Sequence, residues 1–163
     1  MRTAVCPGSF DPITFGHLDI IHRASALFDK VIVLVAVNEQ KKPMFTPDER
    51  ADLIRRVTGD IENVEVDICR GLIADYVRKA GAVAIVKGLR AVTDFEYEFQ
   101  MSLVNRSIYD GAETVFLTTS SENMYLSSSV AKQVAYYGGD ISGFIPGCIL
   151  ADVRARMEKQ DNV

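Results

Sequence analysis

The stretch KVIVLVAV, from Lys30 to Val37, decides the fold class, because its side chains are apolar on both faces of an extended chain. A strand with one face in water alternates apolar and polar residues, whereas a strand inside a parallel sheet is covered by helices on both faces. The stretch therefore predicts a central strand of a parallel sheet.

Short apolar stretches and helical patterns alternate along the rest of the chain. The other expected strands are 3–6, 64–68, 82–86 and 114–118, and the expected helices are 17–28, 47–58, 72–80, 94–109, 128–137 and 147–159. Such alternation is typical of an α/β, Rossmann-like, doubly wound fold with five parallel strands and helices on both faces. We expect a single domain over residues 1–163, with a frayed tail at about 158–163.

Composition excludes several classes of protein. The 163 residues include 18 Lys and Arg against 22 Asp and Glu, which gives a net charge of −4. A net-acidic chain is not expected to hold a nucleic-acid backbone through bulk charge. The apolar run Val31–Val37 is far shorter than the ~20 residues that span a bilayer, and the N-terminus lacks a signal-peptide core. We therefore expect a cytoplasmic protein without nucleic-acid or membrane partners.

Cysteines and histidines do not indicate a metal or redox site. Cys6, Cys69 and Cys148 are far apart and form no C-x-x-C pair, so small buried hydrophobic residues are the favoured interpretation. His17 and His22 are five residues apart, which on a helix separates them by about 140° around the axis. They cannot share a metal ion, and we expect no metal ligands from the protein.

Four loops that follow expected strands carry glycine, hydroxyl or cationic side chains. In a parallel sheet the carboxyl ends of the strands meet at one edge, and ligands bind there where the strand order reverses. The loops are PGSFDPITFGH at 7–17, NEQKKP at 38–43, KGLR at 87–90 and a polar stretch that ends in YLSSS at 125–129. They bring together Lys41, Lys42, Lys87 and Arg90. The pattern predicts a local anion site, for phosphate, on an acidic protein.

Each piece alone also has a structural interpretation. Gly8 could serve a turn, Lys41 and Lys42 could be solvated, and Ser127–Ser129 could be only a helix N-cap. His17, however, lies in the opening turn of an expected helix, where its ring can lean over a phosphate. P-loop, G-x-G-x-x-G and G-x-S-x-G motifs are absent. The remaining parts suit phosphoryl or nucleotidyl transfer by positioning and charge stabilisation.

Thr14-Phe15-Gly16-His17 resembles the T/H-x-G-H signature of the nucleotidyltransferase superfamily. Together with PGSFDPITFGH around it, four further motifs resemble the bacterial phosphopantetheine adenylyltransferases. These motifs are KKPMF at 41–45, GLR at 88–90, DFEYE at 94–98 and SSS at 127–129. The resemblance runs in order from about residue 4 to 146. T-x-G-H alone marks only the superfamily, and the full set is much more specific.

The resemblance implies an enzyme of coenzyme A biosynthesis that reversibly transfers an adenylyl group from ATP to 4′-phosphopantetheine, giving dephospho-coenzyme A and pyrophosphate. It implies direct in-line attack without a covalent intermediate, Mg²⁺ bound mainly through the ATP phosphates, and a cytoplasmic homohexamer. His17 would stabilise the transition state, with Lys41 and Arg90 as further catalytic groups. The implied ATP contacts are Ser9, Phe10, His17, Gly88, Leu89, Arg90, Glu98, Asn123, Met124, Tyr125, Leu126, Ser127, Ser128 and Ser129, and the implied phosphopantetheine contacts are Ser9, Lys41, Ile73 and Lys87.

This sequence departs from the family pattern at three places. Ser9 stands where many members carry threonine, and the stretch 123–126 is less like the usual aromatic-containing one. Lys87 stands where arginine is common, so the charge is kept but the bidentate fork is lost.

Three alternatives remain. The first keeps the fold with another acceptor, nicotinamide mononucleotide or an alcohol phosphate in cytidylyl transfer, and the motifs at 41–45 and 88–98 point away from it. The second is a regulatory nucleotide-binding module, which would release no pyrophosphate when acceptors are supplied. The third is a truncated aminoacyl-tRNA synthetase core, against which the lack of a basic RNA-binding extension argues.

Overall fold

Five strands form one sheet in which every neighbouring pair is parallel. The computed structural model describes residues 1–38, 40 and 42–160. The strand order is β3-β2-β1-β4-β5, so the order reverses between β1 and β4. The strands are β1 (Thr3–Gly8), β2 (Lys30–Ala36), β3 (Val64–Cys69), β4 (Ala84–Leu89) and β5 (Thr114–Thr118). The parallel five-stranded sheet expected from the sequence is confirmed.

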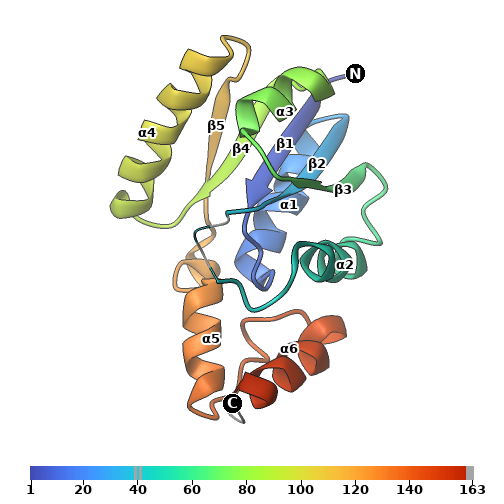
Figure 1. Cartoon of the computed structure of the whole chain (residues 1–163), viewed down its shortest axis with the longest axis vertical. Coiled ribbons are helices and arrows are strands. Elements are labelled where there is room, and N and C mark those ends of the chain that lie inside the picture. The colour runs from blue at the N-terminus through green and yellow to red at the C-terminus, as the bar shows by residue number, and fades with distance from the viewer. Residues whose placement is uncertain (39, 41, 161–163) are drawn as a thin grey trace.

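Helices cover both faces of the sheet (Figure 1). They are α1 (Phe15–Leu27), α2 (Pro47–Val57), α3 (Ile73–Ala80), α4 (Val92–Ile108), α5 (Ser128–Tyr136) and α6 (Gly147–Gln160). One core cluster joins Ala4 and Cys6 of β1 to α1, α2, α5 and α6, and the other joins Val5 to α3 and the end of α4. The expected doubly wound arrangement is therefore confirmed. No helix within 1–38 or 42–160 combines the length and apolarity of a membrane span.

Strand β2 is buried along most of its length, as its sequence predicts. Val31, Val33, Leu34 and Val35 are 0% exposed, and Ile32 is 7% exposed. Its valines face the α1 and α2 side, while Ile32 and Leu34 face the α3 side. Covering both faces removes the need for alternating polar residues.

Most element boundaries differ from expectation by one or two residues, and the differences at β4 and α4 bear on the cleft. The strand expected at 82–86 is β4 at Ala84–Leu89, because pairing with β5 continues to Leu89↔Thr118. The helix expected from 94 starts at Val92, with Ala91 as its N-cap residue. Lys87 and Gly88 thus lie on a strand rather than in a loop, and their places are fixed by the sheet.

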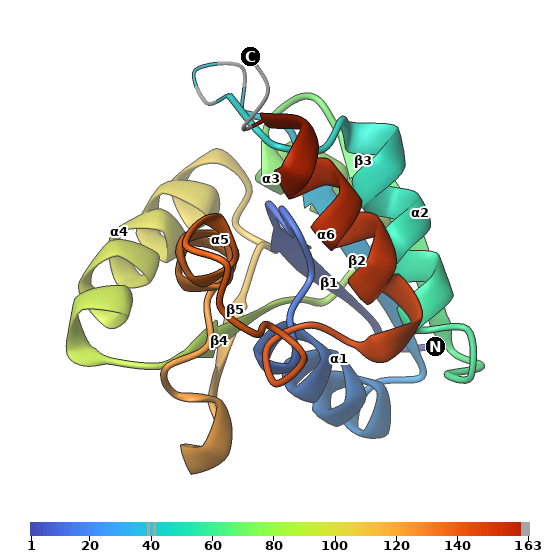
Figure 2. The same ribbon diagram turned by 90° about the horizontal axis from the view of Figure 1, so that it is seen from below.

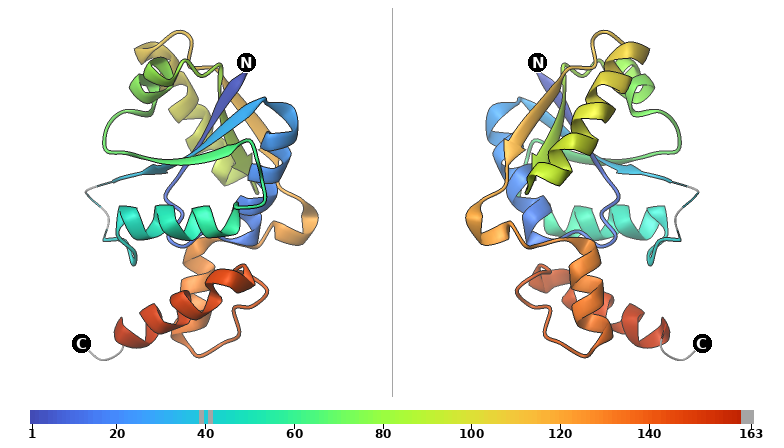
Figure 3. Two further views of the ribbon diagram at one scale, coloured as in Figure 1. Left: turned by 90° about the vertical axis from the view of Figure 1, so that its right-hand side faces the viewer. Right: turned by 90° about the vertical axis from the view of Figure 1, so that its left-hand side faces the viewer.

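Helices α5 and α6 lie beyond the carboxyl ends of the strands, where β1 descends toward them (Figures 1 and 3). Seen from below, they flank the end of β1 (Figure 2). Both join the α1–α2 core through Ala131, Ile149 and Val153. Helices α5 and α6 therefore cover part of the sheet edge at which the site is expected. The tail expected to fray over 158–163 is helical through Gln160, and 161–163 lie outside the described residues.

Candidate active site

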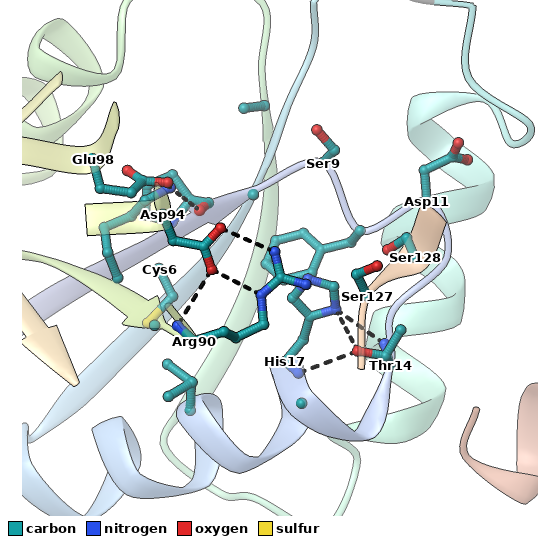
Figure 4. Close-up of a pocket in the computed structure, with 18 of the residues that line it drawn as sticks. Cys6, Ser9, Asp11, Thr14, His17, Arg90, Asp94, Glu98, Ser127 and Ser128 are labelled. Atoms are coloured by element: carbon teal, nitrogen blue, oxygen red, sulfur yellow. Dashed lines mark hydrogen bonds and ion pairs between the residues drawn. The ribbon is translucent and has the colours of Figure 1, made fainter. Parts of the chain in front are cut away.

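A large open cleft of about 770 Å³ lies at the carboxyl ends of β1 and β4, where the strand order reverses. Its walls come from the loop after β1, the first turn of α1, the end of β4, α4 and the N-terminus of α5. Figure 4 shows side chains from these elements pointing toward one another. This is the position at which doubly wound folds bind their ligands.

His17 lies at the third position of α1 and is held by the residue that caps this helix. The backbone N–H of Thr14 donates to His17 Nδ1 at 3.1 Å, and Thr14 Oγ1 lies 3.0 Å from the same nitrogen (Figure 4). Because a backbone N–H can only donate, Nδ1 must accept, and the proton of the neutral ring resides on Nε2. The ring lines the cleft. His17 therefore offers a hydrogen-bond donor whose tautomer is fixed by its own helix cap.

Burial, together with the positive charges of Arg90 and Lys87, lowers the pKa of His17 from its ordinary 6.5 to about 4. The group is neutral at pH 7, which makes it a poor general base but leaves Nε2–H available as a donor. Such a donor can stabilise negative charge that develops on a phosphate oxygen.

The lowered His17 pKa predicts a specific loss of stability in acid. Between pH 6.5 and about 4 the unfolded chain protonates this ring and the folded one does not, so stability present above pH 6.5 falls as pH falls. We expect wild type to lose about 2 kcal/mol more than His17→Gln between pH 7 and pH 5 in urea unfolding. His22→Gln, at an exposed histidine of the same helix, serves as the control and should retain the wild-type loss. Equal losses in wild type and His17→Gln would contradict the pKa assignment.

The turn after β1 presents an exposed Ser9 beside a buried Phe10. Phe10 has φ of 49°, in the left-handed region, and its ring centroid lies 5.1 Å from that of His17 in an edge-on arrangement. A Cβ on Gly8 would lie only 2.9 Å from the Phe10 ring. The Phe10 ring is thus fitted between Gly8 and His17, which explains the glycine.

Arg90 follows β4 and links two walls of the cleft. Its Nε donates to Asp94 Oδ2 at 2.9 Å and its Nη2 to Asp94 Oδ1 at 3.2 Å, a bidentate pair (Figure 4). Its remaining Nη1 donates to the Leu126 carbonyl at 3.1 Å, just before α5. The guanidinium is therefore oriented both by α4 and by the segment that precedes α5.

Lys87 points from β4 into the same cleft. Its Nζ lies 2.9 Å from Glu98 Oε1 on α4 and donates to the Pro7 carbonyl at 3.3 Å. Gly88, next along the strand, has no room for a side chain, because a Cβ would meet Ile20 of α1 at 2.7 Å. Close contact between α1 and β4 brings Lys87 and His17 to one site.

Asp11 is a buried carboxylate that ties three segments together. Its two oxygens accept hydrogen bonds from the backbone N–H groups of Met44 and Phe45, each at 2.9 Å, and Lys132 Nζ of α5 lies 3.0 Å from Oδ2. The segment that follows β2, with Lys42 in the cleft lining, is thereby fixed to the loop after β1.

The N-terminus of α5 faces the cleft with three serines. Ser127 Oγ accepts from the Val130 N–H at 3.1 Å, as expected for an N-cap, and Ser128 Oγ donates to the Pro12 carbonyl at 2.7 Å. Ser129 also lines the cleft. The unpaired N–H groups and partial positive charge of a helix start favour an anion here.

The structure brings most of the predicted site residues to this cleft. It is lined by Ser9, Phe10, His17, Ile73, Lys87, Gly88, Arg90, Glu98, Leu126, Ser127, Ser128 and Ser129. Leu89, Asn123, Met124 and Tyr125 do not line its described part, and their contacts with ATP stay predictions. Lys41 lies outside the described residues, and its role stays a prediction too.

Sequence reasoning missed Arg50, Lys132 and Asp94, all of which line the cleft. Arg50 could have been found, because it falls in register with the buried positions Leu53, Ile54 and Val57 of α2. An arginine on the apolar stripe of a helix requires a partner in the interior.

The sequence and fold match known proteins. The Cytidylyltransferase-like family profile matches residues 5–134. The phosphopantetheine adenylyltransferase of Caldanaerobacter subterraneus is 51% identical over 159 residues, which cover 98% of this chain and 99% of the relative. Those of Clostridium beijerinckii and Heliobacterium modesticaldum are 53% and 54% identical, over 96% and 93% of this chain and 99% and 90% of theirs.

A solved structure supports the fold alone. The "putative nicotinate-nucleotide adenylyltransferase" from Vibrio parahaemolyticus superposes with a TM-score of 0.71 at 17% identity, covering 98% of this chain and 97% of that chain. The family assignment rests instead on relatives that are more than half identical and match nearly end to end. The chain belongs to the phosphopantetheine adenylyltransferase family.

Proposed function

We propose that this enzyme transfers the adenylyl group of ATP to 4′-phosphopantetheine, giving dephospho-coenzyme A and pyrophosphate, by direct in-line attack without a covalent intermediate. The observation that carries the proposal is a neutral, donor-oriented His17 in one cleft with Lys87, Arg90 and the start of α5. The curated relatives bear the name of this activity.

The acceptor phosphate is already ionised at neutral pH, so the reaction needs no strong general base. The barrier comes from bringing two anions together and from charge that develops on the α-phosphate and the departing pyrophosphate. A histidine with a pKa of about 4 suits this task as a donor. His17 Nε2–H would bind the α-phosphate oxygen most tightly in the transition state, and Arg90 and the start of α5 would stabilise the rest of the charge.

The two substrates would meet at the Lys87–Glu98 pair. Lys87, together with Lys41, would hold the acceptor phosphate, and Ile73 at the start of α3 would contact the pantetheine arm. Glu98, the β4 end and residues 123–129 would hold ATP. Ser9, exposed at the cleft, would contact both substrates.

Magnesium would reach the site on the triphosphate. The carboxylates of the described cleft are already paired with cations: Asp11 with Lys132, Asp94 with Arg90 and Glu98 with Lys87. Phosphate oxygens and water are the usual Mg²⁺ ligands in nucleotide enzymes, and this donor set fits that mode. The ion would neutralise charge on the pyrophosphate as it leaves.

Pyrophosphate release tests the function. ATP and Mg²⁺ are supplied with 4′-phosphopantetheine in one arm and with nicotinamide mononucleotide in the other. We expect pyrophosphate and dephospho-coenzyme A in equal amounts from the first arm only. Pyrophosphate release only in the nicotinamide mononucleotide arm would show that the acceptor is this mononucleotide rather than 4′-phosphopantetheine. ATP binding without pyrophosphate release in either arm would favour a regulatory nucleotide-binding module.

We also propose that the enzyme is a cytoplasmic homohexamer. Helix α4 carries large apolar side chains that stay exposed in the single chain, namely Val92, Phe95, Phe99, Leu103 and Val104. Exposed apolar groups in such number are typical of an interface.

An acidic side chain on α4 should therefore weaken the assembly. We expect Leu103→Asp to lower the mass measured by light scattering, because a charge would be buried at the interface. Val83→Asp, at an exposed valine outside α4, is the control and should keep the wild-type mass. An unchanged mass for Leu103→Asp would exclude this face.

A further inference from the structure

Arg50 is a buried arginine whose side chain, among residues 1–38, 40 and 42–160, donates to one backbone carbonyl. It lies on α2 and is 3% exposed, and its Nη1 donates to the Ser9 carbonyl at 2.8 Å. Its Nε is buried without a hydrogen-bond partner in the described part of the chain. Burying an arginine costs several kcal/mol unless its partners compensate. The negative charge of Asp11, in the loop after β1, offsets part of this cost, and the hydrogen bond to the Ser9 carbonyl fixes where the guanidinium lies beneath the turn.

The carbonyl that Arg50 holds controls the conformation of the turn. The Ser9 carbonyl belongs to the peptide unit between Ser9 and Phe10, and rotation of that unit changes φ of Phe10. Phe10 is the described non-glycine residue with positive φ, at 49°. A left-handed conformation costs an L-residue roughly 1–2 kcal/mol, so it persists only where surrounding contacts enforce it.

The conformation of this Ser9–Phe10 turn determines what surrounds His17. Phe10 is 5% exposed, and its ring packs edge-on against the imidazole at 5.1 Å. Ser9, one residue earlier, is exposed at the cleft. A flip of the Ser9–Phe10 peptide would therefore move a substrate-facing hydroxyl and uncover the histidine together.

We propose that Arg50 is a positioning residue: its guanidinium anchors the Ser9 carbonyl, holds Phe10 left-handed, and so keeps Ser9 in the cleft and Phe10 against His17. Arg50 touches neither substrate in this scheme and acts only through the turn. Its effect on turnover rests on the function proposed above, whereas its effect on His17 does not.

The test compares Arg50→Met with Arg50→Lys and Arg55→Met. Arg50→Met removes the donor and keeps much of the apolar stem. Arg50→Lys keeps a donor that can reach the same carbonyl. Arg55→Met is a matched control on the same helix, because Arg55 also donates to one backbone carbonyl, that of Val66, but lies outside the cleft lining.

The main readout is the titration of His17, followed by the nitrogen resonances of histidine-labelled protein and assigned with His22→Gln. The other charged groups near the ring are Arg90 and Lys87, with their partners Asp94 and Glu98, and all four are unchanged in these variants. We expect the His17 pKa to rise by about one unit in Arg50→Met as the Phe10 ring withdraws. Arg50→Lys should restore most of the wild-type value, and Arg55→Met should match wild type.

A double-mutant cycle separates positioning from charge. If Arg50 acts through Phe10, Arg50→Met should add nothing to the His17 shift already caused by Phe10→Ala. An undiminished effect in the Phe10→Ala background would overturn the proposal, as would wild-type His17 resonances in folded Arg50→Met. If Arg50→Met does not fold, Arg50→Lys takes its place in the cycle. Any His17 shift that Arg50→Lys causes in the wild-type background should vanish in the Phe10→Ala background, and a shift that persists there overturns the proposal.

Turnover gives the second readout. We expect a fall of about 10-fold in kcat for Arg50→Met, since small displacements of reacting groups are costly, and a change below twofold for Arg55→Met. A wild-type kcat in Arg50→Met would overturn the catalytic part of the proposal. If wild type itself released no pyrophosphate, the proposed function would fail while the His17 titration still decided the role of Arg50.

Discussion

Replacing His17 with alanine should lower kcat at least ~10²-fold while the KM values for both substrates change little. The ring donates from Nε2 to charge that exists mainly in the transition state, so its loss removes little ground-state binding. Its tautomer depends on the hydrogen bond that Thr14 N–H donates to Nδ1 at 3.1 Å, at the start of α1. Pyrophosphate release under saturating ATP and 4′-phosphopantetheine measures the effect.

Two further variants sharpen this experiment. His17→Gln keeps an N–H donor at a similar reach on a more flexible side chain and should recover part of the lost rate. His22→Ala, at the exposed histidine of the same helix, should leave kcat within twofold of wild type. A His17→Ala enzyme with near wild-type kcat would remove this residue from the catalytic role, and an equal loss in His22→Ala would indicate damage to α1 rather than to the chemistry.

The sheet could be predicted from sequence because a strand that is buried on both faces consists of consecutive apolar residues. No described residue between Val31 and Val35 is polar, and all are buried in the structure. The end of β4 has no such run of apolar residues. Lys87 and Gly88 look like loop residues, yet pairing with β5 extends the strand through them, a long-range effect that a local pattern does not contain.

The cleft could be predicted in outline for a related reason. Parallel strands bring their carboxyl ends to one edge, so Ser9, His17, Lys87 and Arg90 had to converge if the strands were right. Which cation pairs with which carboxylate could not be deduced, because Lys87–Glu98 depends on how α4 leans over β4. The pairing of Asp11 with Met44 and Phe45 is equally non-local.

Replacing Asp11 with alanine should destabilise the fold by about 3–5 kcal/mol, the largest effect that we expect from a single polar side chain here. The carboxylate is almost fully buried and satisfies two backbone N–H groups and the ammonium of Lys132. Alanine would leave the two backbone N–H groups without a partner in the interior and the partly exposed Lys132 without its counter-ion. Urea unfolding at pH 7, followed by circular dichroism, measures the loss.

Asp67 provides the matched control for this experiment. Its carboxylate also accepts two hydrogen bonds, from Tyr76 O–H at 2.6 Å and Ile68 N–H at 2.8 Å, but it is solvent-exposed. Water can replace those bonds, so Asp67→Ala should cost only about 1 kcal/mol. Asp11→Asn should fall between the two, because an amide oxygen can still accept while the amide N–H₂ meets donors. If Asp11→Ala were no more destabilising than Asp67→Ala, the buried carboxylate would not be what holds the segment after β2 at the cleft.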